Sequence, residues 1–212
     1  MASPLKVEFQ FDFGSPNAYL AEVAIPGIEK RTGVKFEYVP VLLGGIYKAT
    51  NNMSPFDALR GIKNKPEYQA LETQRFIRRH NITKFTPNPF FPVNTLMLMR
   101  GAVAAKMEGL FEPYFRAAYH HMWEDPKKMD DVEVFTKAFK SSGVDIDRLF
   151  ARAQQDDVKK KLIDDTTDAV NRGAFGSPTF FVGKEMFFGK DQLRDVEDSI
   201  VEQLGAAKAK SA

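Results

Sequence analysis

The stretch Phe9-Gln10-Phe11-Asp12-Phe13-Gly14-Ser15-Pro16-Asn17-Ala18-Tyr19-Leu20-Ala21 decides the fold that this chain is predicted to adopt. Apolar and polar side chains alternate along its first part, which is typical of a buried or half-buried strand. The alternation breaks at Gly14-Ser15-Pro16, and apolar residues then follow at helical spacing. Ser15 suits the N-cap of that helix and Pro16 its first position. The stretch therefore predicts a strand, a tight turn and a helix that begins beside the Ser15 hydroxyl.

The turn at Ser15 is the strongest candidate for chemistry. The dipole and the free N–H groups of a helix N-terminus favour negative charge, so Ser15 could donate a hydrogen bond to the anionic sulfur or oxygen of a ligand. A plain N-cap without a ligand is the alternative. A Ser-His-Asp triad has no motif support, because His80, His120 and His121 all lie in predicted helices and no Gly-x-Ser-x-Gly occurs.

Composition excludes several classes of protein. The chain has 212 residues, of which 43% are hydrophobic and 27% charged, as in a folded protein with one sizeable core. The net charge of +2 argues against a nucleic-acid partner held by bulk electrostatics. Cysteine is absent, so the chain supplies no disulfide, thiolate nucleophile or Cys-ligated metal site. Without a secretory h-region or a long apolar run, we expect a cytoplasmic protein with no membrane partner.

The order of the predicted elements gives the fold class. A second strand over 34–40 completes a βαβ unit, and two short strands over 179–182 and 185–188 form a hairpin before a last amphipathic helix. The block between them is helical, with predicted helices over 67–80, 93–107, 110–123, 131–140, 147–153 and 156–171. This order predicts an α/β, thioredoxin-like fold (βαβ … ββα) with a large all-helical insertion.

Domain boundaries follow from the same order. We expect residues 1–49 and 174–212 to form the thioredoxin-like domain and residues 50–173 to form the helical insertion domain. Residues 50–66 are polar and follow a strand, so we expect them to form a long ligand-facing loop. The tail over 205–212 is small and basic, and we expect it to fray.

Two further segments carry candidate binding residues. The Gly-rich approach to Ser177-Pro178 before a strand predicts a cis proline, which would expose the Ser177 backbone as an edge for an extended peptide; an ordinary turn is the alternative. In Gly189-Lys190-Asp191, amides and the Lys190 ammonium could hold a carboxylate while Asp191 pairs with an ammonium. An acidic residue that stabilises a helix start is the alternative there.

The remaining polar candidates are weaker. Asn52, Lys63 and Lys65 could reach a second carboxylate of a ligand, although loop charges are usually only solvated. Asp12 lies between two strand phenylalanines, where a structural hydrogen bond is favoured over catalysis. His120 and His121 do not predict a metal site, because neighbouring helical residues diverge by about 100° and no acidic partner stands at ligand spacing. We therefore expect no metal.

Three motifs together resemble one family. Residues 11–21, 174–179 and 188–193 are similar to segments of the 2-hydroxychromene-2-carboxylate isomerase family, which is grouped with kappa-class glutathione transferases and thioredoxin-like oxidoreductases with a helical insertion. The motifs occur in the family's order and spacing, and the resemblance extends from Val7 to Leu204. The chain departs from the family pattern at Ser177, where an apolar residue is common, and at Lys190, where Asn or Ser is expected.

The resemblance implies a glutathione site. Ser15 stands where the related oxidoreductases have their first catalytic cysteine, and it would hydrogen-bond the glutathione thiolate. Pro178 corresponds to the family's cis proline, and Ser177 would present backbone groups to the cysteinyl part. The other positions that the resemblance assigns to glutathione are Asn52 in the loop, Lys65 near the glycine carboxylate, and Lys190 and Asp191 at the γ-glutamyl end.

The resemblance also implies an activity. It predicts glutathione-dependent conversion of 2-hydroxychromene-2-carboxylate, or a related small aromatic intermediate, into trans-o-hydroxybenzylidenepyruvate by reversible thiolate addition. The substrate site would be walled by Phe85, Phe90, Phe91 and Trp123, and the protein would be a homodimer. Two alternatives stay open: a kappa-like transferase or peroxidase that consumes glutathione, and a non-catalytic thioredoxin-like module that binds peptides.

Overall fold

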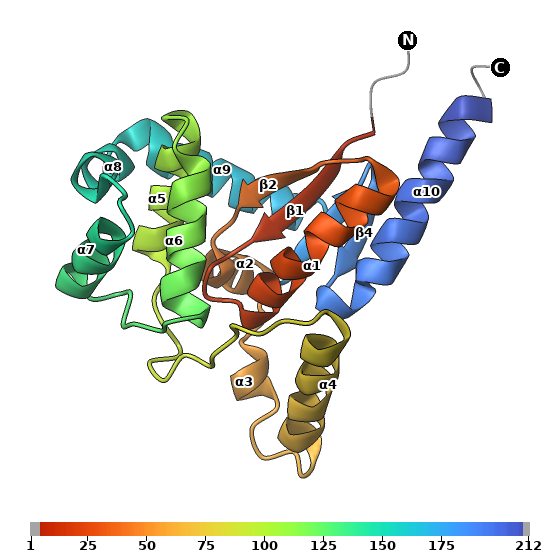
Figure 1. Ribbon diagram of the computed structural model, residues 1–212, viewed down its shortest axis with the longest axis horizontal. Helices are drawn as coiled ribbons and strands as arrows, with labels where there is room; N and C mark the ends of the chain where they lie inside the picture. Colours follow the sequence, from red (N-terminus) through yellow and green to blue (C-terminus); the bar gives the residue numbers. More distant parts are fainter. Residues whose placement is uncertain (1–4, 210–212) are drawn as a thin grey trace.

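One mixed four-stranded sheet lies at the centre of residues 5–209, the part of the chain that the computed structural model describes (Figure 1). The strands are β1 (Val7–Phe11), β2 (Phe36–Pro40), β3 (Thr179–Val182) and β4 (Glu185–Phe188), in the order β2-β1-β3-β4. Strand β1 pairs parallel with β2 and antiparallel with β3, and β3 pairs antiparallel with β4. The predicted βαβ and ββα units are confirmed.

Helices cover both faces of this sheet. Helix α1 (Pro16–Thr32) ends at Gly33, which adopts φ of 74°, a conformation that glycine takes at little steric cost. A short 3-10 turn, η1 (Lys190–Gln192), leads into α10 (Leu193–Ala209). Helices α1 and α10 lie side by side on one face, and α9 lies behind the sheet (Figure 1). No helix within the described residues is long and apolar enough to cross a membrane.

Eight helices lie between β2 and β3 in the described chain. They are α2 (Leu43–Thr50), α3 (Pro55–Ala58), α4 (Lys65–Arg79), α5 (Leu96–Met107), α6 (Phe111–Trp123), α7 (Val132–Ser141), α8 (Ile146–Ala153) and α9 (Asp156–Asn171). Helix α7 begins at Asp131, whose carboxylate accepts hydrogen bonds from two backbone N–H groups, as its N-cap role requires. The predicted α/β, thioredoxin-like fold with a large helical insertion is therefore the observed fold.

Several predicted boundaries are wrong by a few residues, and one segment is wrong in kind. Residues 50–66 are not a continuous loop, because Pro55–Ala58 form α3 behind the N-cap Ser54 and α4 already begins at Lys65. The tail does not fray at residue 205, since α10 continues through Ala209; residues 210–212 lie outside the described residues.

The core is built outward from β1. All five of its residues are buried, and on one face Phe9 stacks on Phe180 of β3 at 5.4 Å and meets Tyr38 of β2 edge-on at 5.3 Å between ring centroids. Helix α5 is the buried central helix that the sequence predicted, although it begins at Leu96 instead of residue 93. A Cβ on Gly101 of α5 would lie 2.1 Å from the Tyr114 hydroxyl, so only glycine permits this approach of α5 to α6.

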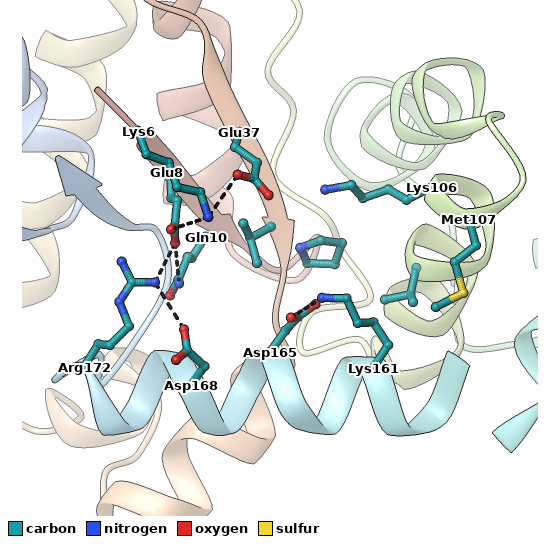
Figure 2. Close-up of a pocket in the computed structure, with 13 residues that line it drawn as sticks. Lys6, Glu8, Gln10, Glu37, Lys106, Met107, Lys161, Asp165, Asp168 and Arg172 are labelled. Carbon is teal, nitrogen blue, oxygen red and sulfur yellow. Dashed lines mark hydrogen bonds and ion pairs between the residues drawn. The ribbon is translucent and has the colours of Figure 1, made fainter. Parts of the chain in front are cut away.

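The opposite face of β1 carries polar side chains. Glu8 is buried and pairs with Arg172 at 2.7 Å and with Lys6 at 2.9 Å, while Lys161 pairs with Asp165 on the facing helix α9. These residues line a cleft of about 190 Å³ among β1, β2, α5 and α9 (Figure 2). Because acidic and basic groups there bind one another, we interpret this cleft as the ionic seam that joins the sheet to the inserted helices.

Candidate functional site

Ser15 lies at the point where β1 passes into α1. It is the N-cap of α1, and its Oγ accepts a hydrogen bond from the Ala18 N–H at 3.2 Å. The same hydroxyl donates to the Ser177 carbonyl oxygen at 2.8 Å, across 162 positions in the sequence. Ser15 is only 5% exposed. The predicted N-cap is confirmed. The hydroxyl proton points to the segment that contains Ser177 and Pro178, which is called the proline loop below.

The proline loop also has the predicted geometry. The Ser177-Pro178 peptide bond is cis. The Ser177 hydroxyl accepts a hydrogen bond from the Asp12 N–H at 3.1 Å, so two hydrogen bonds join this loop to the Ser15 turn. The expectation of an exposed Ser177 edge is wrong for this state of the protein, because Ser177 is 8% exposed and its carbonyl is occupied by Ser15.

Asp12 holds the turn from behind. One carboxylate oxygen accepts from the Gly14 N–H at 2.8 Å, and the other accepts from the Leu43 N–H at the start of α2 at 2.7 Å. The Thr95 hydroxyl is a third partner. Burial raises the pKa of Asp12, and these hydrogen bonds oppose the rise. The sequence favoured a structural hydrogen bond for Asp12, but its distant partners carry no local signal.

The inserted helices fix the remaining atoms of the turn. The Trp123 indole N–H donates to the Phe13 carbonyl at 2.7 Å, and the Phe13 N–H points to the Met99 sulfur at 3.4 Å. A Cβ on Gly14 would lie 2.9 Å from the Thr95 methyl group, so glycine is needed for the close contact with the start of α5. The strand-to-helix turn is therefore held by four separate parts of the chain.

Lys190 and Asp191 directly follow Gly189, which is hydrogen-bonded to the proline loop. The Gly189 N–H donates to the Pro178 carbonyl at 2.9 Å, which ties the start of η1 to the cis proline. The Lys190 ammonium binds both oxygens of the Asp191 carboxylate, at 2.7 and 2.8 Å, and lies 5.0 Å from the centre of the Phe76 ring of α4. Lys190 is 4% exposed. The two predicted ligand groups are thus already paired with each other.

The two loop candidates differ in their placement. Asn52 Nδ2 donates to the Phe175 carbonyl at 2.9 Å, two residues before Ser177. Lys65 is the exposed first residue of α4, and among the described residues it makes no ion pair or side-chain hydrogen bond with the other candidates. The structure thus links Ser15, Ser177, Pro178, Lys190, Asp191 and Asn52 into one region and leaves Lys65 apart.

Aromatic side chains border the Ser15 turn. Phe85 stacks on Trp123 at 6.0 Å, Phe91 lies 6.3 Å from Trp123, and exposed Phe56 of α3 meets Phe91 edge-on at 6.2 Å between ring centroids. Because the Trp123 indole contacts the Phe13 carbonyl, this cluster begins two residues from Ser15. Phe56 belongs to the segment that was predicted as polar loop, so the sequence analysis missed it.

The prediction that His120 and His121 have no acidic partner at ligand spacing is wrong. Ligand atoms of His120, His121 and Asp125 lie within 4.8 Å of one another, although the sequence suggested no acidic partner at ligand spacing. The turn at the end of α6 brings Asp125 back to the two imidazoles. The Asp125 carboxylate binds the Lys127 ammonium, so a cation already occupies this group. Burial lowers the pKa of His121 to about 4.

The fold and the site define the class of protein. A thioredoxin-type sheet, a helix N-cap at the turn after β1 and a facing cis proline occur together with inserted helices. The model of the DsbA-like thioredoxin domain matches residues 6–201, and the chain therefore belongs to the DsbA-like thioredoxin family.

Particular relatives within that class are enzymes. The chain is 29% identical over 203 residues to a 2-hydroxychromene-2-carboxylate isomerase of Sphingobium xenophagum, with 92% of this chain and 98% of that protein covered. It is 25% identical over 204 residues to glutathione S-transferase kappa 1 of Rattus norvegicus, with 90% and 88% covered. A solved 2-hydroxychromene-2-carboxylate isomerase matches with a TM-score of 0.77 at 24% identity, covering 97% of this chain and 98% of that one.

The buried Asp12 carboxyl gives a prediction for stability against pH. An unfolded aspartate ionises near pH 4, whereas burial raises the pKa of Asp12 in the folded protein. As pH rises above roughly 4, the unfolded state therefore loses this proton first, and the folded state loses relative stability. Asp12→Asn has no such proton. We expect the free energy of unfolding of the wild type, minus that of Asp12→Asn, to decrease as pH rises from about 4 to 7 in urea titrations.

A control separates this effect from general charge. Asp164 lies on the exposed surface of α9, and Asp164→Asn should not show the same decrease. A difference between wild type and Asp12→Asn that stays constant over the pH series contradicts the prediction.

Proposed function

We propose that this protein binds reduced glutathione with its sulfur at Ser15 and uses it to isomerise 2-hydroxychromene-2-carboxylate, or a related aromatic intermediate, to trans-o-hydroxybenzylidenepyruvate. The observation that carries the proposal is the Ser15 hydroxyl, which caps α1 and lies 2.8 Å from the carbonyl next to a cis proline. The similarity to isomerases over nearly the whole chain supports the same reaction.

The Ser15 site fits a thiolate. The chain has no cysteine, so a thiol must come from a ligand. A thiolate there meets the positive end of the α1 dipole, which favours its charged form. The Ser15 hydroxyl has a single proton, and without a ligand it donates that proton in a hydrogen bond to the Ser177 carbonyl oxygen. Rotation about the Ser15 side chain would turn that proton toward sulfur.

The same rotation of the Ser15 hydroxyl frees the Ser177 carbonyl in the proline loop. Once Ser15 turns away, the Ser177 carbonyl becomes available to the N–H of the cysteinyl residue of glutathione, as in pairing of an extended peptide with a strand edge. One hydroxyl thus exchanges an internal partner for the ligand and uncovers a second contact. We propose this exchange as the way in which Ser15 and Ser177 bind the cysteinyl part together.

The Lys190–Asp191 pair suits the γ-glutamyl end. That end carries an α-carboxylate and an α-ammonium, and Lys190 and Asp191 present the opposite charges side by side. The side chain of Asp191 is 63% exposed, whereas that of Lys190 is 4% exposed, so Asp191 is the group that a ligand can reach directly. We propose that Asp191 binds the ammonium, that Lys190 orients Asp191, and that Asn52 and Lys65 lie toward the glycine end.

The chain's residues would support isomerisation as follows. The chemistry that glutathione supplies when bound is a nucleophile that adds reversibly to a conjugated carbon and leaves again, so that a former double bond can rotate. Ser15 and the α1 N-terminus stabilise the negative charge on sulfur as it arrives and as it leaves. Phe56, Phe85 and Phe91 offer apolar surface for an aromatic substrate beside the turn. Regeneration of glutathione makes it a cofactor.

A kappa-like transferase is the second candidate, because the relative in Rattus norvegicus carries that name and covers most of the chain. It would use the same Ser15 site but consume glutathione. We also propose that the protein acts as a cytoplasmic homodimer, by analogy with the family that the motifs resemble.

The activity test combines two readouts. We expect purified protein with a catalytic amount of glutathione to change the absorbance of 2-hydroxychromene-2-carboxylate while the thiol titre stays constant. Ser15→Ala should lower kcat by on the order of a hundredfold, because a donor to developing charge is lost. Ser141→Ala, which removes a hydroxyl that donates to a carbonyl at 2.7 Å on α7, is the matched control and should keep full activity.

The outcomes separate the candidates. Loss of thiol with an electrophile or hydroperoxide, and no change of the chromene, would indicate the transferase or peroxidase. Glutathione binding with neither reaction would indicate the non-catalytic module and sink the isomerase proposal.

The γ-glutamyl contact has its own test. Asp191→Asn should weaken binding of glutathione on the order of three- to tenfold, since one partly exposed charge pair is lost. It should leave the affinity for cysteinylglycine unchanged, because that dipeptide lacks the γ-glutamyl group. Calorimetric titration of both ligands into both proteins measures this, and an equal loss for the two ligands would show that Asp191 acts elsewhere.

A further inference from the structure

A second cleft, of about 450 Å³, lies where α2, α5 and α9 meet. Helix α9 packs against both α2 and α5. Most of its wall is apolar, with one side formed by a continuous face of α9. The lining residues are Leu42, Gly45, Ala49, Leu96, Arg100, Lys159, Leu162, Ile163, Thr166, Thr167, Val170 and Asn171. None of them is a candidate for glutathione, so the groove is made of residues that the proposed function does not use.

The charged residues that line this groove are all basic. Arg100 and Lys159 line it, and no acidic residue does. Lys159 pairs at 3.3 Å with Asp156, a fully exposed carboxylate at the start of α9. The charged cleft of Figure 2 is different, because four acidic residues line it together with its basic ones. The groove therefore has a positive potential above an apolar floor, which favours an anion with an apolar body.

Arg100 differs from the other half-buried arginines in its lack of an acidic partner within the described residues. It is half-buried, and it has no ion-pair partner among residues 5–209. The other half-buried arginines are satisfied internally: Arg152 binds Glu108 and Asp157, and Arg172 binds Glu8 and Asp168. A guanidinium is a planar fork that matches a carboxylate through two parallel hydrogen bonds. Arg100 thus presents an unused carboxylate-binding group at an apolar groove.

We propose that the groove among α2, α5 and α9 is a binding site for a small apolar carboxylate, with the carboxylate on Arg100 and the apolar body against Leu42, Leu96 and Leu162. The volume is within the range of small-molecule sites, and a few polar groups in an apolar wall are their usual composition. The Thr167 and Asn171 side chains lie on the same wall and offer further polar contacts. This site is independent of the glutathione proposal.

Two residues of the groove are neighbours in sequence of residues that hold the Ser15 turn. Leu42 and Leu96 stand next to Leu43 and Thr95, the two residues outside the turn that bind the Asp12 carboxyl. Leu42 is also fixed to α9, because its N–H donates to the Thr166 hydroxyl at 3.0 Å. The start of α2 is therefore held to α9 through Leu42 and to the Asp12 carboxyl through Leu43.

The test measures binding without glutathione. We expect 2-naphthoate to bind the full chain saturably in calorimetric titration, and 2-naphthamide, which has the same shape without the charge, to bind more weakly. Arg100→Gln should weaken binding of 2-naphthoate by about tenfold or more and abolish the preference over the amide. Ala49→Phe, at an exposed position of α2 that lines the groove, should also reduce the affinity by filling it.

Two controls make each outcome decisive. Lys160→Gln removes the same charge from a neighbouring, outward position of α9 and should leave the affinity unchanged. Ser15→Ala should leave it unchanged as well. Absence of saturable binding, or equal affinity in Arg100→Gln and wild type, would overturn the proposal. Loss of binding in Ser15→Ala with retention in Arg100→Gln would place the carboxylate at the Ser15 site and equally overturn it, and failure of glutathione to bind bears only on the proposed function.

Discussion

The hydrogen bond from the Ser15 hydroxyl to the Ser177 carbonyl is the contact on which the candidate site depends. It joins the end of β1 to the cis-proline loop before β3, two segments that the sheet already places next to each other. Its donor is the N-cap residue of α1, and its acceptor is the carbonyl of the residue before the cis proline Pro178. The bond also fixes where the single hydroxyl proton points before a ligand arrives.

Residues from the helices that follow β2 hold the turn beside this contact. Asp12, Phe13 and Gly14 are held by Leu43, Thr95, Met99 and Trp123, which belong to α2, the α5 region and α6. A turn fixed from so many sides loses little conformational freedom when it binds a ligand, and such preorganisation favours both affinity and stabilisation of charge. The insertion therefore contributes to the site twice, since it also supplies the aromatic side chains beside the turn.

The sequence predicted what depends on local signals. Alternation gave β1, the Ser-Pro pair gave the start of α1, and the Gly-rich Ser177-Pro178 segment gave the cis bond. Contacts between distant segments could not be predicted, because no periodicity records that Ser15 meets Ser177 or that Asp12 meets Leu43. The pairing of Lys190 with Asp191 was not predicted for another reason: the sequence pattern assigns both charges to a ligand, whereas in the structure they bind each other. Arg100 carried no motif at all and stands out only through what surrounds it.

The thiol pKa of bound glutathione tests the central claim most directly. Thiolate absorbance is followed against pH with saturating reduced glutathione, for wild-type protein and Ser15→Ala. A free thiol has a pKa of about 8.5, and the helix N-terminus and the Ser15 hydroxyl should lower it. We expect a lowered pKa in the wild type that returns toward the free value in the variant. An equally lowered pKa in both proteins, or an unshifted pKa in the wild type, would contradict the role assigned to Ser15.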